Sequence, residues 1–347
     1  MRPHGPDSAP PAQVRWGVVG TGPIAARVLG DLALTPGAVL AGVCSRTAAG
    51  GAAFAAAHGV GRTYTDPAAL AADVDVVYVA TPHAAHLDAA AAAMAAGTAV
   101  LVEKPLTATL AGARRLVEVA REHDVFCMEA MWTRFLPVTA ELLDVAASGE
   151  VGRLRALHAS IGSLVPPEPG GRLHDPQQGG GALLDIGVYP VWLALLLLGP
   201  VSSVAVAGEV SPGGVDVLSG LLLGHEGGAV SLLSSTLSSS AAGDAVLEGS
   251  LGAVRLEAPL WAPPALTVLH GAGVSAQPAD RTVRPGRRGA GYVHMLEHVQ
   301  ECVLAGLTES PLHPLGTTLA VMEVLEQALD QLGVVRPDEV ETAGSRA

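Results

Sequence analysis

The chain has 347 residues, of which 49% are hydrophobic and 15% charged, and its formal net charge is −13 at pH 7. This length favours two domains, and the composition suits a chain that buries a core. The negative charge argues against a nucleic-acid partner, because phosphate binding needs clustered Lys and Arg. The most apolar run, residues 193–198, is far shorter than the roughly 20 residues of a membrane helix, so no membrane partner is expected.

The first residues and the cysteines point to the cytoplasm. Residues 1–13 contain three prolines among the first ten positions and no apolar run, which predicts a disordered tail and not a signal peptide. Cys44, Cys127 and Cys302 lack the spacing of a disulfide framework or a metal site. His294 and His298 lack the order of a zinc-binding H-E-x-x-H motif, so no metal is expected.

Residues 14–130 alternate β-like runs with helical stretches, a pattern typical of a parallel sheet covered by helices. The predicted strands are residues 14–19, 39–44, 74–80, 99–102 and 125–129. The predicted helices are residues 24–34, 48–58, 84–96 and 110–123. Most of these are rich in alanine, the strongest helix former. We therefore expect a doubly wound α/β domain over residues 14–130.

The pattern changes from about residue 150, where β-like runs follow one another without helices between them. The predicted strands are residues 153–161, 204–209, 215–223, 229–237, 245–249, 253–257 and 266–270. Such an order favours a largely antiparallel sheet. Two helices, residues 292–305 and 317–332, follow it. We expect an α+β domain over residues 131–335, for the substrate and for oligomerisation, and a C-terminal tail over residues 336–347.

A G-x-G-x-x-A motif directly follows the first predicted strand, and it comprises Gly20, Thr21, Gly22, Pro23, Ile24 and Ala25. The first glycine permits a tight turn, the second allows a pyrophosphate to approach the backbone, and the small alanine lets the helix pack closely on the strand. The helix N-terminus then offers free N–H groups to the anion. In a chain with 42 glycines the motif alone is weak evidence, but its position between a strand and a helix predicts a Rossmann domain that binds a dinucleotide.

The end of the second predicted strand indicates which dinucleotide is bound. A carboxylate at this point would bind a ribose 2′-hydroxyl and favour NAD. This chain has Ser45 and Arg46 instead. A hydroxyl and a guanidinium suit a 2′-phosphate, so NADP is favoured and NAD stays open.

Lys104 is the single lysine among the 20 residues counted as Lys plus Arg. Arginine replaces lysine elsewhere in this chain, but a guanidinium cannot give up a proton in a protein. The lone lysine is therefore a candidate for chemistry that arginine cannot perform, although chance retention would leave the same pattern.

Five stretches together resemble a known family: G-V-V-G-T-G at 17–22, A-T-P-H-A-A-H at 80–86, E-K-P at 103–105, E-A-M-W-T-R-F at 129–135 and G-G-G-A-L-L-D-I-G-V-Y-P at 179–190. The chain resembles the glucose–fructose oxidoreductase, inositol dehydrogenase and rhizopine-catabolism family (Gfo/Idh/MocA). Within this family it is most similar to the dihydrodiol and xylose dehydrogenase branch. The glycine motif is weakly specific, whereas the combination of all five is strongly specific.

The resemblance implies that Lys104 lies beside the nicotinamide and the substrate hydroxyl. It also implies a loop that borders the cofactor, and the expected cofactor-side residues here are Thr81, Pro82, His83, His86 and Glu103. Many members carry a histidine as acid/base candidate in an Asp-x-Gly-x-His stretch. This chain has Tyr189 at that position, as in the dihydrodiol dehydrogenase branch, where a tyrosine carries the proton together with the lysine.

A tyrosine can act as a base near neutral pH only if its pKa falls by roughly 3 units from about 10. We expect the ammonium of Lys104 and the positive charge of the oxidised nicotinamide to lower the pKa of Tyr189 in a dry pocket. Asp185 lies four residues before Tyr189, a spacing that places both on one face of a helix, although Pro190 can kink it. Asp185 is expected to pair with Lys104 or to bind a substrate hydroxyl.

Trp132 and Arg134 follow the last predicted strand of the first domain, at the sheet edge where ligands bind in such folds. An apolar ring face and a hydrogen-bonding fork suit a polyol or an arene diol, and packing between domains is an equally good explanation. We expect an NADP-dependent oxidoreductase that transfers a hydride between nicotinamide and the CH–OH group of a sugar, polyol or trans-dihydrodiol. The alternatives are redox-neutral sugar chemistry with a retained cofactor and a non-catalytic regulator that binds NADP and a sugar. The resemblance also favours a homodimer or a larger homo-oligomer.

Overall fold

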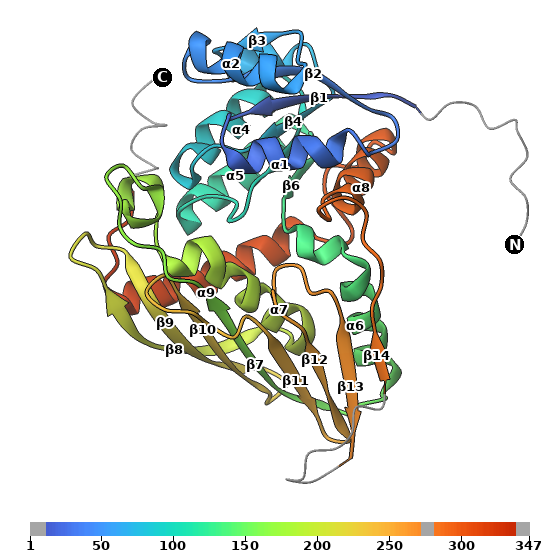
Figure 1. Ribbon diagram of the computed structural model, residues 1–347, viewed down its shortest axis with the longest axis vertical. Helices are drawn as coiled ribbons and strands as arrows, with labels where there is room; N and C mark the ends of the chain where they lie inside the picture. Colours follow the sequence, from blue (N-terminus) through green and yellow to red (C-terminus); the bar gives the residue numbers. More distant parts are fainter. Residues whose placement is uncertain (1–11, 272–280, 338–347) are drawn as a thin grey trace, which may run out of the picture.

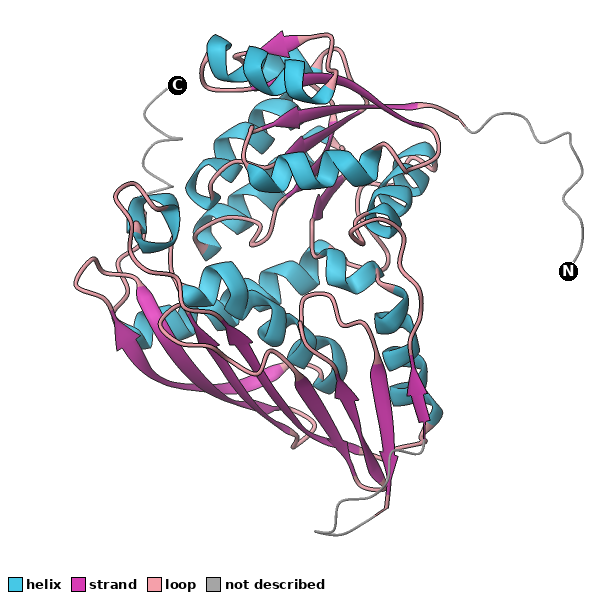
Figure 2. Ribbon diagram, in the orientation of Figure 1, coloured by secondary structure: helices cyan, strands magenta, loops and turns pink. Residues whose placement is uncertain are grey.

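The computed structural model describes residues 12–271 and 281–337. Two sheets lie at opposite ends of the molecule, and helices pack between and around them (Figures 1 and 2). The residues that follow the first sheet along the chain, including α6 (Pro137–Ser148), connect the two sheets.

The first sheet contains six parallel strands in the order β3-β2-β1-β4-β5-β6. Their bounds are β1 Val14–Val19, β2 Ala38–Cys44, β3 Thr63–Tyr64, β4 Val76–Val79, β5 Ala99–Val102 and β6 Cys127–Glu129. This order is that of the dinucleotide-binding doubly wound fold, so the predicted fold class is confirmed. The sequence pattern missed β3, because two residues are too few to show an alternation.

Five helices flank this sheet: α1 Pro23–Leu32, α2 Ala48–His58, α3 Pro67–Ala71, α4 His86–Ala95 and α5 Leu110–His123. Thr47, Asp66 and Thr109 begin α2, α3 and α5, and each side chain accepts a hydrogen bond from a backbone N–H of the first turn. All residues of β4 and β5 are buried. Helices on both faces of the sheet explain why these strands are continuous apolar runs.

The second sheet has eight strands in the order β14-β13-β12-β11-β7-β10-β9-β8. All neighbours are antiparallel except β7 and β10, so the expected largely antiparallel sheet is confirmed. The bounds are β7 Leu154–Gly162, β8 Val201–Val210, β9 Asp216–His225, β10 Val230–Thr236, β11 Ala245–Gly249, β12 Gly252–Leu256, β13 Leu266–His270 and β14 Arg281–Val283.

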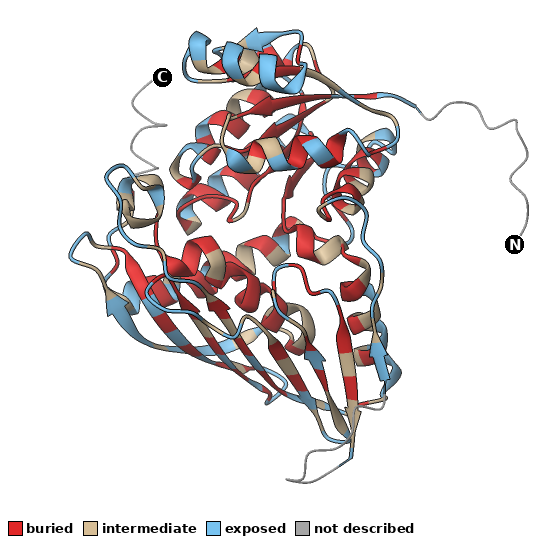
Figure 3. Cartoon of the chain, in the orientation of Figure 1, coloured by how far each residue is buried: buried red, intermediate tan, exposed pale blue. Residues whose placement is uncertain are grey.

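Two helices occupy the space between the sheets. α7 (Val188–Leu198) packs on β7 and β10, and α9 (Leu315–Leu332) packs on β8 as well as on α5 and β6 of the first unit. α8 (Val293–Leu304) instead lies against α1. Figure 3 shows α7 and the strands of the first sheet mainly in the colour of buried residues, whereas β8 and α2 are largely exposed. The late helices therefore join the two halves into one packed body.

The segment Pro176–Leu198 is long and apolar enough to span a membrane, with a mean hydropathy of 1.9 over its most apolar window. However, 72% of that window is buried inside the protein. Packing of α7 between the second sheet and α9 explains this composition.

Candidate functional site

A cavity of about 1010 Å³ lies at the carboxyl ends of the parallel strands. The loops after β1, β2, β4 and β5 form one wall, and residues of the second half form the other. Ligands bind at this edge in open α/β sheets. Most of the residues expected from the sequence line the cavity: Gly20, Thr21, Gly22, Pro23, Ile24, Ser45, Arg46, Thr81, Pro82, His83, Glu103, Lys104, Trp132, Asp185 and Tyr189.

The glycine motif fits a pyrophosphate. Gly20 has a φ of +112°, and a Cβ there would lie 2.4 Å from the carbonyl oxygen of Ala80. Gly22 precedes Pro23 at the start of α1, and a Cβ on it would meet no atom within 4 Å. The N-terminus of α1 has no side-chain cap, so its N–H groups face open space that a phosphate can fill.

The loop after β2 forms the far end of the cavity. Thr21 Oγ1 and Ser45 Oγ lie 3.5 Å apart, and the exposed Arg46 is the next residue along the chain. These groups are hydroxyls and a guanidinium, with no carboxylate at the end of β2. These hydrogen-bond donors therefore suit a negatively charged group of a ligand at this end of the cavity.

At the opposite end, the loop after β4 presents a hydroxyl to the cavity. Thr81 Oγ1 is buried and has no hydrogen-bond partner in the part of the chain that the structure describes. A buried unpaired hydroxyl is costly unless a ligand satisfies it. Thr81 lines the same cavity as the glycine motif, so its position fits the nicotinamide half of a dinucleotide.

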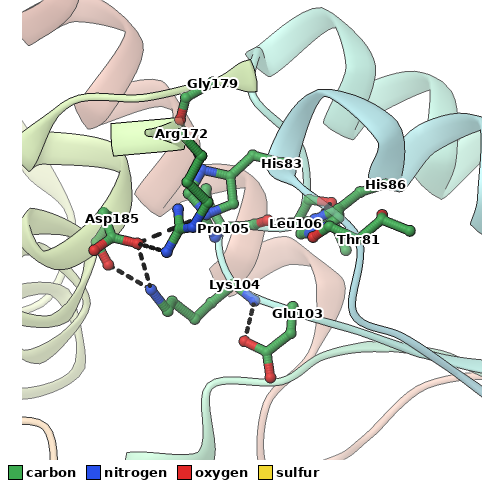
Figure 4. Close-up of polar contacts among 10 residues, drawn as sticks. All are labelled: Thr81, His83, His86, Glu103, Lys104, Pro105, Leu106, Arg172, Gly179 and Asp185. Carbon is green, nitrogen blue, oxygen red and sulfur yellow. Dashed lines mark hydrogen bonds and ion pairs between the residues drawn. The ribbon is translucent and has the colours of Figure 1, made fainter. Parts of the chain in front are cut away.

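Two positively charged side chains, Lys104 and Arg172, contact Asp185 at this end of the cavity (Figure 4). Lys104 Nζ donates to the backbone oxygen of Asp185 and lies 3.6 Å from its carboxylate oxygen Oδ1. Arg172 donates to the same Oδ1 at 2.8 Å. Burial by itself would raise the pKa of the Asp185 carboxyl, but Lys104 and Arg172 hold it well below its usual range. The structure thus brings Lys104 and Asp185 together as expected.

His83 completes this group as a neutral ring. Its Nδ1 donates to the carbonyl oxygen of Gly179 at 2.8 Å, and its Nε2 lies 4.0 Å from Asp185 Oδ1. Burial, followed by the neighbouring His86, lowers the pKa of His83 well below its usual range. The contact with Asp185 is therefore not an ion pair, and the unprotonated Nε2 lies beside the Asp185 carboxylate.

Glu103 holds the backbone on which Lys104 sits. Tyr78 donates to Glu103 Oε1 at 2.5 Å, and the backbone N–H of Lys104 donates to Oε2 at 3.2 Å. Burial raises the pKa of Glu103. Glu103 also lines the cavity, so it both supports Lys104 and faces the ligand space.

Tyr189 differs from the expectation. Lys104 Nζ lies 5.2 Å from the centroid of the Tyr189 ring, and Trp132 Nε1 donates to the Tyr189 hydroxyl at 3.1 Å. Burial and then the negative charge of Glu103 raise the pKa of Tyr189, so Lys104 by itself does not produce the expected lowering. The phenol keeps its proton, and because Trp132 donates to the oxygen, that proton remains for a ligand.

The backbone between Asp185 and Tyr189 also differs from the expected α-helix. Residues Leu183–Gly187 form a π-helix that continues into α7. Pro190 lies in the first turn of α7 and has no N–H to donate to the preceding turn. The carbonyl oxygen of Asp185, within the π-helix, accepts Lys104 Nζ. Asp216 of β9 fixes the start of the segment by accepting the N–H of Leu183 at 2.8 Å.

Two expected site residues lie elsewhere. Arg134 does not line the cavity, and its Nε donates to the carbonyl oxygen of Leu312 at 2.9 Å, so the substrate-binding prediction for it is wrong. His86 is fully buried beneath the cavity wall, which corrects its assignment as a cofactor contact. Trp132 does line the cavity.

The sequence did not single out Arg172, Trp261 or Tyr292, which also line the cavity. The ring of Tyr292 stacks on Trp132 with 4.3 Å between centroids. These residues come from distant parts of the second half, and no local motif marks them. Only their fold-dependent proximity to Lys104 and Tyr189 reveals them.

Comparison with known proteins agrees with this geometry. Residues 14–131 match the oxidoreductase family with an NAD-binding Rossmann fold, and residues 139–255 match the GFO/IDH/MocA C-terminal domain. The chain belongs to the Gfo/Idh/MocA family. It is an NAD(P)-dependent dehydrogenase.

This Gfo/Idh/MocA protein is similar along nearly its whole length to trans-1,2-dihydrobenzene-1,2-diol dehydrogenases. It is 33% identical to the Mus musculus protein over 94% of its own chain and 99% of the relative. The Xenopus laevis protein is 30% identical over 93% of this chain and 99% of the relative. The resemblance inferred from the five sequence motifs is confirmed.

Among solved structures, a 3-ketoreductase from Actinomadura kijaniata in complex with NADP and TDP-benzene matches with a TM-score of 0.78 and 26% identity, covering 94% of this chain and 99% of that one. A levoglucosan dehydrogenase in complex with NADH and levoglucosan has a TM-score of 0.81 and 20% identity, covering 92% and 97%. The second likeness concerns the fold alone. The two cofactors in these complexes leave the choice between NADP and NAD open.

Proposed function

We propose that this enzyme is an NADP-dependent dehydrogenase that interconverts a CH–OH group and a carbonyl group of a sugar, a polyol or a trans-dihydrodiol. The observation that carries the proposal is the position of Lys104, whose ammonium is held by Asp185 at the nicotinamide end of the cavity. The near full-length similarity to dihydrodiol dehydrogenases and the fit to a ketoreductase support the substrate class.

The bound nicotinamide supplies or accepts the hydride, so the protein has to position the substrate and manage one proton. We assign Lys104 to hold the reacting oxygen and to stabilise its developing negative charge. Tyr189 presents its proton to the same space, because Trp132 occupies a lone pair of the phenol oxygen and not its proton. In carbonyl reduction Tyr189 donates this proton to the substrate oxygen and regains one from solvent. Alcohol oxidation runs these steps in reverse, so the phenol must first lose its proton to solvent. Asp185 orients Lys104 and Arg172.

The choice of NADP rests on the far end of the cavity. Ser45 and Arg46 line it, and a 2′-phosphate carries the charge that a guanidinium binds best. A ribose 2′-hydroxyl alone would leave Arg46 without a charged ligand.

A substrate screen tests the proposal. Sugars, polyols and trans-dihydrodiols are offered with NADP and with NAD, the matching carbonyl compounds are offered with the reduced cofactors, and absorbance of the reduced nicotinamide is followed. We expect turnover with at least one class and a higher kcat/KM with NADP. Net turnover confined to NAD would overturn the cofactor assignment, and cofactor retained without any net absorbance change would favour redox-neutral chemistry.

We also propose that two copies pair through the outer face of the second sheet. Leu222 of β9 is 51% exposed, and its neighbour across the ladder, Leu232 of β10, is 44% exposed. Leu222 also pairs with Ala205 of β8, and Gly220 pairs with Ala207, so small residues flank the exposed leucines on this face. Sedimentation of Leu222→Glu tests this: we expect a shift from dimer to monomer, and a monomeric parent protein would refute the pairing.

A further inference from the structure

His86 lies at the start of α4 with its ring fully buried, between the loop that follows β4 and the loop that follows β5 (Figure 4). Its Nε2 is 2.9 Å from the carbonyl oxygen of Thr81. Its Nδ1 is 3.1 Å from the carbonyl oxygen of Pro105 and 3.3 Å from that of Leu106. One ring therefore contacts the cofactor loop on one side and the residues directly after Lys104 on the other.

All three of these neighbours are acceptors, because a carbonyl oxygen has no proton to donate. Burial lowers the pKa of His86 to about 4, so the ring is neutral at physiological pH and carries a single N–H. The tautomer protonated on Nδ1 donates a hydrogen bond to the Lys104 loop, whereas the tautomer protonated on Nε2 donates to the carbonyl oxygen of Thr81. A neutral ring has one N–H, so it cannot donate to both loops at once.

The Lys104 loop has another fixed point close by. Glu129 Oε1 accepts the backbone N–H of Leu106 at 3.0 Å, and its Oε2 accepts His313 and Thr318, each at 3.0 Å. The N–H of Leu106 is therefore held by Glu129, and the carbonyl groups beside it face His86. In contrast, Thr81 presents a buried hydroxyl that awaits a ligand. His86 is the side chain that joins these two loops.

We propose that His86 is a positioning residue that sets the Lys104 loop and the cofactor loop relative to each other, through one N–H that either loop can use. This inference rests on the proposed function, because it takes Lys104 as the group that acts on the substrate and Thr81 as part of the cofactor contact. His86 itself touches neither the cavity nor its contents.

Two isosteric substitutions separate the two sides of the ring. The amide nitrogen of asparagine occupies nearly the place of Nδ1, and that of glutamine nearly the place of Nε2. We expect His86→Asn to keep kcat within about threefold while weakening NADP binding by about tenfold, because one hydrogen bond to Thr81 is lost. His86→Gln should show the reverse: NADP affinity within about threefold and kcat lower by about tenfold.

NADP binding is measured by titrating tryptophan fluorescence with NADP itself, so this readout does not depend on turnover. His225→Asn is the matched control: His225 is buried in the second sheet, where its ring contacts Gly199 and Ser231. We expect the control to leave both kcat and NADP affinity unchanged. Equal losses of kcat and affinity in the two His86 variants would overturn the proposal, and so would no loss in either.

The unmodified protein offers a measurement that does not depend on variants folding. In ¹⁵N-histidine NMR at about pH 5, below the usual histidine pKa, we expect the buried ring of His86 to stay neutral with one protonated nitrogen. If every histidine resonance showed a doubly protonated ring there, the single-proton argument would fail. Failure of the proposed function looks different: Lys104→Arg would then retain turnover, while His86→Asn would still weaken NADP binding and His86→Gln would still leave it nearly unchanged.

Discussion

The two ends of the cavity are built in different ways. At the end proposed for the nicotinamide, Lys104 and Asp185 are nearly buried, come from different halves of the chain and contact each other, and Arg172 also contacts Asp185. At the other end, Ser45 and the exposed Arg46 belong to a single loop of the first unit. Charges in a buried network depend strongly on one another, whereas an exposed guanidinium acts nearly alone. Substitutions should therefore have large and coupled effects at the first end and small, separable effects at the second.

Lys104→Arg should give the largest effect. Arginine keeps the positive charge but has a longer and planar head that cannot occupy the same place between Asp185 and the substrate. We expect kcat to fall by roughly 10²–10³-fold, the range for a lost group that stabilises a developing oxyanion, with NADP affinity nearly unchanged. Steady-state kinetics and NADP titration measure the two. Near-normal turnover would remove the chemical role assigned to Lys104.

Asp185→Asn should come next. It leaves two buried cations without their carboxylate, and we expect kcat/KM to fall by about 10²-fold and the free energy of unfolding by about 3 kcal/mol at pH 7. Because the folded-state pKa of Asp185 is lowered, its stabilising effect is present above the unfolded value near 4 and is lost as the pH falls further. The stability gap between the two proteins should thus shrink below about pH 4 in denaturant titrations. A gap that grows on acidification would contradict this assignment.

Tyr189→Phe should have a smaller effect, because Lys104 remains in place. We expect carbonyl reduction to slow by about 10²-fold, the low end for a lost general acid, with unchanged NADP affinity. Since burial raises the pKa of Tyr189, the phenol stays protonated through neutral pH, and reduction by the parent enzyme should show no loss of this acid between about pH 6 and 9. A basic limb near neutrality that disappears in Tyr189→Phe would show that the pKa is low after all.

Arg46→Ala should have the smallest effect and touch only the cofactor. One charge-assisted contact with a 2′-phosphate is worth about 1.5–3 kcal/mol, so the KM for NADP should rise by about tenfold or more. The KM for NAD should stay within about twofold, because that cofactor has no charge at this position. Equal increases for both cofactors would show that Arg46 does not recognise the phosphate.

Most of the parallel-sheet part of the chain could be predicted from the sequence. Strands buried on both faces give continuous apolar runs, and the glycine motif lies at a strand–helix junction, so both are visible in short stretches of sequence. The motifs also located Lys104 and Asp185 before their contact was visible. Arg172 and Tyr292 could not be predicted, because their roles depend on packing between segments far apart in the chain. The assignments of Arg134 and His86 failed for the same reason: each lies in a recognisable motif, but only the fold decides which way a side chain points.

The π-helix at Leu183–Gly187 has a consequence for how the site tolerates length changes. A π-helical turn holds one residue more than an α-helical turn, and each residue advances an α-helix by about 100°. Removing Ile186 would restore regular winding, and either Asp185 or Tyr189 would then rotate away from the cavity, although every side chain with a chemical role would still be present. The orientation of Asp185 relative to Tyr189 thus depends on the number of residues in one helical turn. Deletion of a single residue there should therefore be more damaging than many substitutions.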